Sequence, residues 1–215
     1  MASSRVADVF GVGDVLAKSE SACVELPDGK QIYGIKMEEA KGISLQELIT
    51  IASNKENRVV VMKEAMGQYL KLKFLDAICE QIDRSNHSNV ICDVKETKML
   101  VNGETKTLYT VAGIKGIDND LAFGNADPTT IRTAMRSILD RFQKIPKEIV
   151  EQFINADVNE LSSSVADVLE PEARDKMLLR FTGFKQVLQD AMRDDPGKFI
   201  DSKEMKDFYS LNDIR

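Results

Sequence analysis

Residues 81–89 read QIDRSNHSN, and residues 116–124 read GIDNDLAFG. Both stretches are acidic, and the segment between them has the pattern of a β-hairpin. A hairpin brings its two ends together, so we expect Asp83 and Asp118 to converge on one point. Converging Asp and Asn oxygens are suitable ligands for Mg²⁺, because this hard cation prefers oxygen. The sequence therefore predicts a divalent-cation site at the open end of the hairpin.

The segments around this site have clear periodicities. Strands are expected over residues 90–101 and 105–114, because Asn102-Gly103 between them favours a tight hairpin turn. A long, buried helix is expected over residues 57–80, leading straight into Asp83. Its apolar residues recur at helical spacing, namely Val59, Met62, Met66, Tyr69, Leu70, Phe74, Ala77 and Ile78.

The two ends of the chain have different characters. Apolar and polar residues alternate in a second predicted hairpin, residues 21–38, whose turn is Pro27-Asp28-Gly29. Ser44 and Glu47 then form a capping-box pattern for a short helix. From about residue 127 onward the pattern is helical throughout. We expect an α+β fold that is mostly helical, divided into an N-terminal segment (1–42) and a helical domain (43–215).

Composition narrows the function classes. The 215 residues are 43% hydrophobic and 30% charged, with a net charge of −6, which argues against a basic nucleic-acid groove. The sequence contains no run of 18 apolar residues, so no membrane span is predicted. The three widely spaced cysteines form no metal-ligand pattern, which favours a cytoplasmic setting, in the producing cell or in a host cell if the protein is a secreted effector.

The order of these parts resembles the protein-kinase-like superfamily. The similarity is closest to the phosphatidylinositol 3-/4-kinase branch, especially the type II phosphatidylinositol 4-kinases and their bacterial relatives. That branch has an Asp-Arg catalytic loop ending in Asn, a long hairpin, and an Ile-Asp-Asn-Gly-Leu-Ala-Phe metal motif. Residues 82–89 and 117–123 resemble these two motifs, and the similarity extends over about residues 5–145.

The resemblance implies a role for each matching position. Asp83 is expected to orient or deprotonate the acceptor hydroxyl, and Arg84 to pair with an acidic group or approach a phosphate. Asp118 and Asn89 are expected to hold Mg²⁺ (or Mn²⁺) on the phosphates of ATP. The adenine-binding hinge is expected at Met37, Glu38, Glu39 and Ala40.

Two positions leave alternatives open. The family places its metal-binding Asn five residues after the catalytic Asp, where this chain has Ser88. The loop therefore either bulges to use Asn89 or uses Asn86. Asp120 replaces the Gly of the family motif, and it is either an extra metal ligand or a cap for the next turn. Both acidic stretches are also compatible with ordinary polar turns and helix caps.

No glycine-rich phosphate loop and no phosphate-binding strand Lys precede the first predicted hairpin, so most of a kinase N-lobe is not seen. We therefore expect a fragment of a longer kinase, a chain completed by a partner, or an inactive member. The leading hypothesis is an ATP- and Mg²⁺-dependent phosphotransferase. The sequence does not identify its acceptor, which is a protein, a lipid or a small molecule. The alternatives are a noncatalytic pseudokinase-like regulatory module and a helical protein-interaction module.

Overall fold

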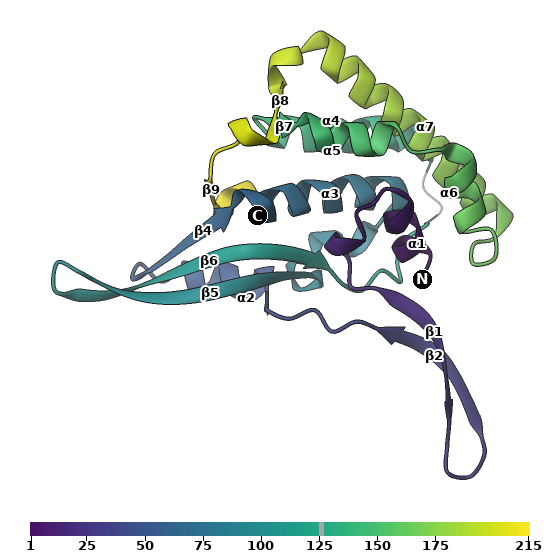
Figure 1. The fold of residues 1–215 in the computed structure, drawn as a ribbon, viewed down its shortest axis with the longest axis horizontal. Coiled ribbons are helices and arrows are strands. Elements are labelled where there is room, and N and C mark those ends of the chain that lie inside the picture. Colours follow the sequence, from purple (N-terminus) through teal and green to yellow (C-terminus); the bar gives the residue numbers. More distant parts are fainter. Residues whose placement is uncertain (125–126) are drawn as a thin grey trace.

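A computed structural model of the chain describes residues 1–124 and 127–215 (Figure 1). The fold is α+β, as predicted, with 49% helix and 26% strand. A five-stranded sheet, the long helix α3 (Lys63–Cys79) and a group of C-terminal helices are packed on one another in that order. None of the helices in the described residues combines the length and the apolar character needed to cross a membrane.

The main sheet has the strand order β3-β5-β6-β4-β9. Its core is the predicted hairpin, β5 (Val90–Val101) and β6 (Glu104–Gly116), which is confirmed together with its turn. Asn102 and Gly103 have φ angles of 53° and 82°, the left-handed pair that a tight hairpin turn requires. The other strands are β3 (Ile43–Ser44), β4 (Asn57–Met62) and β9 (Phe208–Ser210).

The prediction of one helix over residues 57–80 is wrong at its start. Residues 57–62 form β4, which pairs in parallel with β6 and in antiparallel orientation with β9. Three consecutive β-branched residues, Val59 to Val61, fit a pleated strand better than a helical turn. The helix α3 begins only at Lys63, after Met62 has taken an extended conformation.

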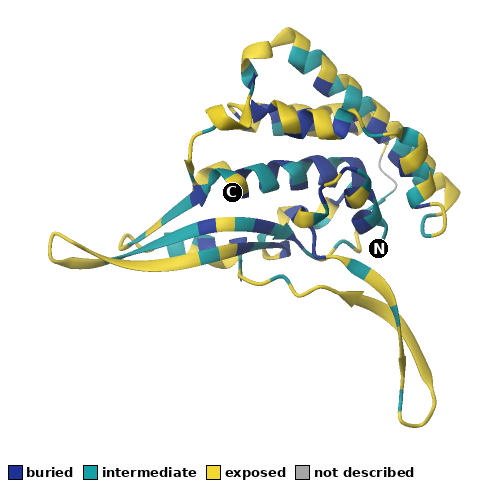
Figure 2. Ribbon diagram, in the orientation of Figure 1, coloured by how far each residue is buried: buried dark blue, intermediate teal, exposed yellow. Residues whose placement is uncertain are grey.

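The hydrophobic core surrounds α3, which packs against the main sheet as well as against the other helices (Figure 2). Phe10 stacks on Phe153 with ring centroids 4.7 Å apart, and Phe74 meets the edges of Phe153 and Phe184. Residues from the N-terminal 42 positions therefore share one core with the helical region. The helices involved are α1 (Ala2–Val9), α4 (Ile131–Arg141), α5 (Lys147–Ile154), α6 (Val158–Ser164) and α7 (Pro171–Asp194).

The first predicted hairpin is also confirmed, as β1 (Ser19–Glu25) and β2 (Gln31–Met37). It projects away from the rest of the molecule, and every residue of β2 is exposed (Figures 1 and 2). The predicted cap is present as well, because Ser44 Oγ accepts a hydrogen bond from the Glu47 amide at 3.1 Å and begins α2 (Leu45–Ala52).

The prediction that residues after 127 are helical throughout is wrong in the C-terminal tail. The tail returns to the body of the protein, where β8 (Phe199–Ile200) pairs in parallel with β7 (Ile145–Pro146) and β9 extends the main sheet. Such pairings join residues far apart in sequence, so local periodicity does not reveal them. Short 3₁₀ turns complete this part and the N-terminal region: η1 (Gly13–Val15), η4 (Pro128–Thr130), η5 (Pro196–Lys198), η6 (Ser202–Glu204) and η7 (Leu211–Asp213).

Candidate functional site

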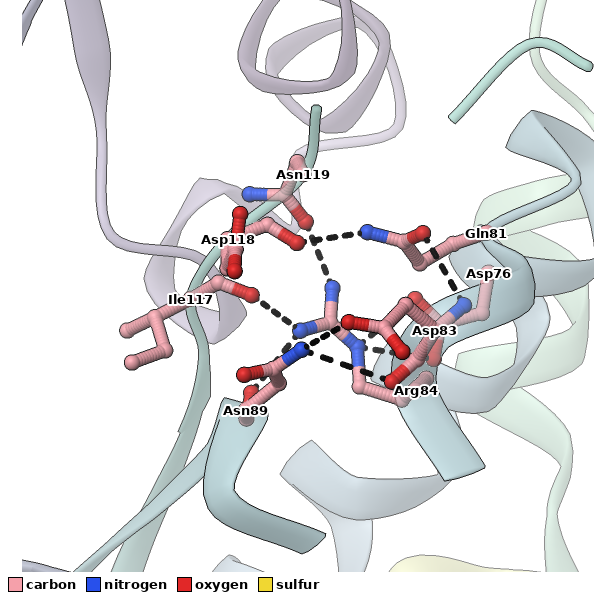
Figure 3. A network of polar contacts seen from close by, with 8 residues as sticks. All are labelled: Asp76, Gln81, Asp83, Arg84, Asn89, Ile117, Asp118 and Asn119. Atoms are coloured by element: carbon pink, nitrogen blue, oxygen red, sulfur yellow. Dashed lines mark hydrogen bonds and ion pairs between the residues drawn. The ribbon is translucent and has the colours of Figure 1, made fainter. Parts of the chain in front are cut away.

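The two acidic stretches lie side by side at the open end of the β5–β6 hairpin (Figure 3). The first consists of two 3₁₀ turns, η2 (Ile82–Ser85) and η3 (His87–Asn89), capped by the side chains of Gln81 and Asn86. The second follows Gly116 directly. The Ile117 amide donates a hydrogen bond to the Asn89 carbonyl at 3.0 Å, so the two loops are joined by their main chains.

Arg84 is buried between the loops, with 3% of its surface exposed. Its Nε atom lies 3.1 and 3.2 Å from the two carboxylate oxygens of Asp76 in α3. Burial raises the pKa of the Asp76 carboxyl group, and the charges of Arg84 and Lys73 oppose that rise. Of the two predicted roles for Arg84, pairing with an acidic group is the one confirmed.

The same guanidinium group binds both loops (Figure 3). Nη1 donates to the carbonyl oxygens of Asn89 at 2.8 Å and Ile117 at 2.5 Å, and Nη2 donates to Asn119 Oδ1 at 2.5 Å. Gly116 makes room for it, because a Cβ atom at that position would lie 2.8 Å from Arg84 Cζ. One buried cation therefore sets the relative position of the two acidic loops.

The carboxylates of the two loops influence each other. Asp83 accepts a hydrogen bond from Asn89 Nδ2 at 2.6 Å. The pKa of Asp118 is raised, first by a hydrogen bond with Asp120 and by burial, then by the negative charges of Asp120 and Asp83, against the lowering effect of Arg84. The structure thus brings together the predicted residues Asp83, Asn89, Asp118 and Asp120.

Asn86 is used differently. Its side-chain oxygen accepts a hydrogen bond from the Ser88 amide at 3.1 Å and caps η3. Between the two predicted asparagine ligands, Asn89 is therefore the one that contacts Asp83. Asp118 has a φ angle of 55°, and its carbonyl oxygen accepts from Gln81 Nε2 at 2.8 Å. A non-glycine residue in this left-handed conformation stores strain, which is typical of functional loops.

The donor set is compatible with Mg²⁺ but small. Across residues 1–124 and 127–215, no three His, Cys, Asp or Glu side chains form a group that could hold a metal ion. A cation would rest on the carboxylates of Asp83 and Asp118 and on the amide oxygen of Asn89. The raised pKa of Asp118 reflects crowded negative charge, and a bound divalent cation would relieve that crowding.

The predicted hinge lies at the foot of β2. The Glu38 amide donates to the Lys18 carbonyl at 2.8 Å, and its carboxylate accepts from Lys115 Nζ at 2.9 Å. The hydrogen bond from Lys115 is the main reason why the pKa of Glu38 is lowered. Met37 ends β2 with half its surface exposed, Glu39 is exposed, and Ala40 is half-buried. These contacts attach the β1–β2 hairpin to the end of β6, next to the second acidic loop.

Several residues of the site were missed from sequence. Asp76 and Gln81 orient the first loop, and a second buried ion pair, Arg180 to Glu80 at 2.8 Å, attaches the end of α3 to α7. Arg180 also donates to the Ile78 carbonyl at 3.0 Å. The sequence signal for Asp76 and Arg180 was a charged residue within an apolar stretch. Such a residue indicates an ion pair, because charged side chains are rarely buried unless they are paired.

No family model matches this chain, and no curated protein sequence matches it either.

Proposed function

We propose that this protein is an ATP- and divalent-cation-dependent phosphotransferase, with Asp83 as the catalytic carboxylate and Asp118 as the metal-binding carboxylate. The single observation that carries the proposal is the arrangement around Arg84. Arg84 holds the two acidic loops together, although the negative charges of Asp83 and Asp118 repel each other. A folded protein retains such repulsion most readily where a cation or a phosphate-bound metal relieves it.

The chain's own residues would act mainly by positioning. Asp83, oriented by Asn89 Nδ2, would accept a hydrogen bond from the acceptor hydroxyl and take its proton. Asp118 and the Asn89 amide oxygen would hold the metal ion, which supplies charge neutralisation on the ATP phosphates. Asp120 would be an additional acidic group beside Asp118. Phosphoryl transfer depends on such positioning and charge stabilisation more than on covalent chemistry of the protein.

A hollow of about 1130 Å³ between the N-terminal helix and the foot of the β1–β2 hairpin is the place proposed for the nucleotide. Its lining includes Lys18, Lys36, Glu38 and Lys115, and it lies at the foot of the β1–β2 hairpin. Lys115 belongs to β6, which ends at Gly116 and leads into the second acidic loop, so this strand connects the hollow to that loop. We propose residues 37–40 as the adenine-facing segment and these lysines as phosphate contacts. The acceptor stays open between proteins, lipids and small molecules, and a cytoplasmic setting stays a prediction.

The test is transfer of label from γ-labelled ATP with Mg²⁺ or Mn²⁺. The acceptors are the chain itself, phosphatidylinositol vesicles and a casein mixture. Asp83→Asn and Asp118→Asn are expected to reduce transfer about a hundredfold or more, because each removes a group used in the transition state. Asp140→Asn, which changes an exposed carboxylate of α4, is the matched control and should leave transfer unchanged. Absence of transfer to every acceptor by the folded wild-type chain would contradict the proposed activity.

A noncatalytic regulatory module is the second candidate, and the exposed hairpin favours it. Within the described residues, β1 and β2 form a sheet of their own. They expose apolar side chains, namely Val24, Ile32, Tyr33, Ile35 and Met37. Unpaired strand edges are suited to pairing with a strand from a partner or from another segment. We propose that such a strand would complete the N-terminal sheet.

Thermal denaturation with ATP and Mg²⁺ separates these candidates from a helical interaction module. A nucleotide at 100 times its dissociation constant raises the free energy of unfolding by about 2.7 kcal/mol. Stabilisation together with transfer supports the enzyme, and stabilisation without transfer supports the regulatory module. No stabilisation by any nucleotide would favour a protein that works through its helical surfaces.

A further inference from the structure

Two cationic side chains contact Tyr69 on the side of α3 that faces α4. Lys73 Nζ lies 5.2 Å from the centre of the Tyr69 ring, and Arg141 Nη1 donates to the Tyr69 hydroxyl at 3.2 Å. Within the described part of the chain, no carboxylate lies within 4.0 Å of either cation. Asp76, the nearest acidic residue in α3, is already paired with Arg84.

The positive charge extends beyond this pair. Burial is the main cause of a lowered pKa for Lys73; the charges of Arg84 and Arg141 lower it further, and Asp76 opposes them. In a chain with a net charge of −6, this is a local concentration of cations that carboxylates do not neutralise.

A cavity of about 570 Å³ opens beside Arg141. Its lining includes Arg141, Lys144 and Lys206, with Met66, Phe142 and Tyr209 as apolar walls. The Phe142 ring is 6.2 Å from the Tyr69 ring, so the apolar wall continues to the residue that holds the two cations. The volume falls in the usual range for small-molecule sites.

The two carboxylates on the cavity wall are already engaged. Asp213 accepts hydrogen bonds from the amide and hydroxyl groups of Ser210 at 2.8 and 2.9 Å, and Glu204 accepts from the Asp201 amide at 3.3 Å. Both therefore cap 3₁₀ turns of the tail. The lining also holds three cations, Arg141, Lys144 and Lys206, which outnumber these two carboxylates, and an anionic ligand would complement them.

We propose that this cavity binds a small organic phosphate that carries an aromatic ring. The phosphate group is held by Arg141, with Lys206 of the cavity lining as the second positive charge, because a guanidinium fork and an ammonium group are strong donors to phosphate oxygens. The ring packs against Phe142 and Tyr209. The site uses none of the proposed catalytic residues, so it is independent of the phosphotransferase assignment.

Phenyl phosphate is the probe, tested in magnesium-free buffer at constant ionic strength. Calorimetry measures its affinity, and ¹³C-methyl NMR of the methionines reports its location, because Met66 and Met205 line the cavity. We expect phenyl phosphate to bind more tightly than inorganic phosphate or benzyl alcohol and to shift the Met66 and Met205 signals. Arg141→Met should weaken binding about tenfold or more, since a charge-assisted hydrogen bond is lost.

The controls separate this site from the acidic loops. Arg132→Met changes an exposed arginine on the opposite face of α4, and Asp118→Asn changes the proposed metal site; both should keep the affinity for phenyl phosphate. Lys206→Met, which removes the second cation of the lining, should weaken binding, although less than Arg141→Met. Unchanged affinity in Arg141→Met, or no shift of the Met66 and Met205 signals in the wild-type chain, would overturn the proposal. Either result leaves the phosphotransferase assignment untouched.

Discussion

The two hairpins of this protein form by the same local chemistry but differ in what supports them. The β5–β6 hairpin contributes buried side chains such as Cys92, Val111 and Ile114 to the core, and its open end is held by Arg84. Among the residues that the structure describes, the β1–β2 hairpin pairs only with itself, and every residue of β2 is exposed. A turn sequence is therefore enough to predict a hairpin, but tertiary packing decides whether the hairpin can position a site.

The ion pairs of the two hairpins show the same contrast. Arg84 and Asp76 are almost fully buried, with 3% and 10% of their side-chain surfaces exposed. Lys36 and Glu20, on opposite strands of the β1–β2 hairpin, are exposed by 73% and 69%. Breaking a buried pair leaves an uncompensated charge, whereas water compensates an exposed one.

The largest expected effect comes from these two pairs. Arg84→Met should lower the free energy of unfolding by about 3–5 kcal/mol, because it leaves the Asp76 carboxylate buried without a partner. Lys36→Met should change it by no more than about 1 kcal/mol. Urea denaturation of both variants measures the difference. Similar losses in the two variants would show that the hairpins are supported alike.

A glycine in each hairpin gives a second, smaller test. Gly116→Ala should cost about 1–3 kcal/mol, because the added Cβ would lie 2.8 Å from both Arg84 Cζ and Leu72 Cδ1. Gly34→Ala places a methyl group where no atom lies within 4 Å, so the change should stay within about 0.5 kcal/mol. Thermal denaturation compares the two, and a neutral Gly116→Ala would mean that Arg84 can shift without loss.

The smallest effects concern two carboxyl groups beside the end of β6. Glu38 has a lowered folded-state pKa, so its stabilising contribution is present above the unfolded pKa and is lost as pH falls. Asp118 has a raised folded-state pKa. Its stabilising contribution to the fold is therefore present below the unfolded pKa and is lost as pH rises through the folded pKa. Carboxyl ¹³C NMR titration should find the pKa of Glu38 below and that of Asp118 above their ordinary values.

One variant of each neighbour identifies the cause. Asp120→Asn should lower the pKa of Asp118 toward its ordinary value, and Lys115→Met should raise that of Glu38. If Asp120→Asn leaves the titration of Asp118 unchanged, the acidic loops are less crowded than the structure indicates.

Local patterns predicted the local features. Pro27-Asp28-Gly29 and Asn102-Gly103 marked both hairpins, and Ser44 marked the start of α2. The residues before α3 misled the prediction, because Val59 to Met62 fit the helical spacing and form a strand only through pairing with β6 and β9. Such pairings depend on distant segments, which a window of local sequence does not contain.

The candidate site divides in the same way. The acidic residues Asp83 and Asp118 were found from sequence because their loops flank a recognisable hairpin. Their support was not found, since Asp76 and Arg180 become partners of other residues only when α3, α7 and the loops have packed together. The sequence therefore indicated the candidate reactive side chains, and the structure was needed to identify the residues that position them. The nucleotide, the metal and the acceptor stay predictions.

Arg84 fixes the loops chiefly through carbonyl oxygens, which every amino acid supplies, and it depends on few of the side chains that would meet a substrate. The framework and its reactive groups can therefore change separately during evolution. Descendants of this fold could lose or exchange the acids at positions 83 and 118 while keeping the same loop shape. An inactive relative would then be expected to superimpose closely on an active one.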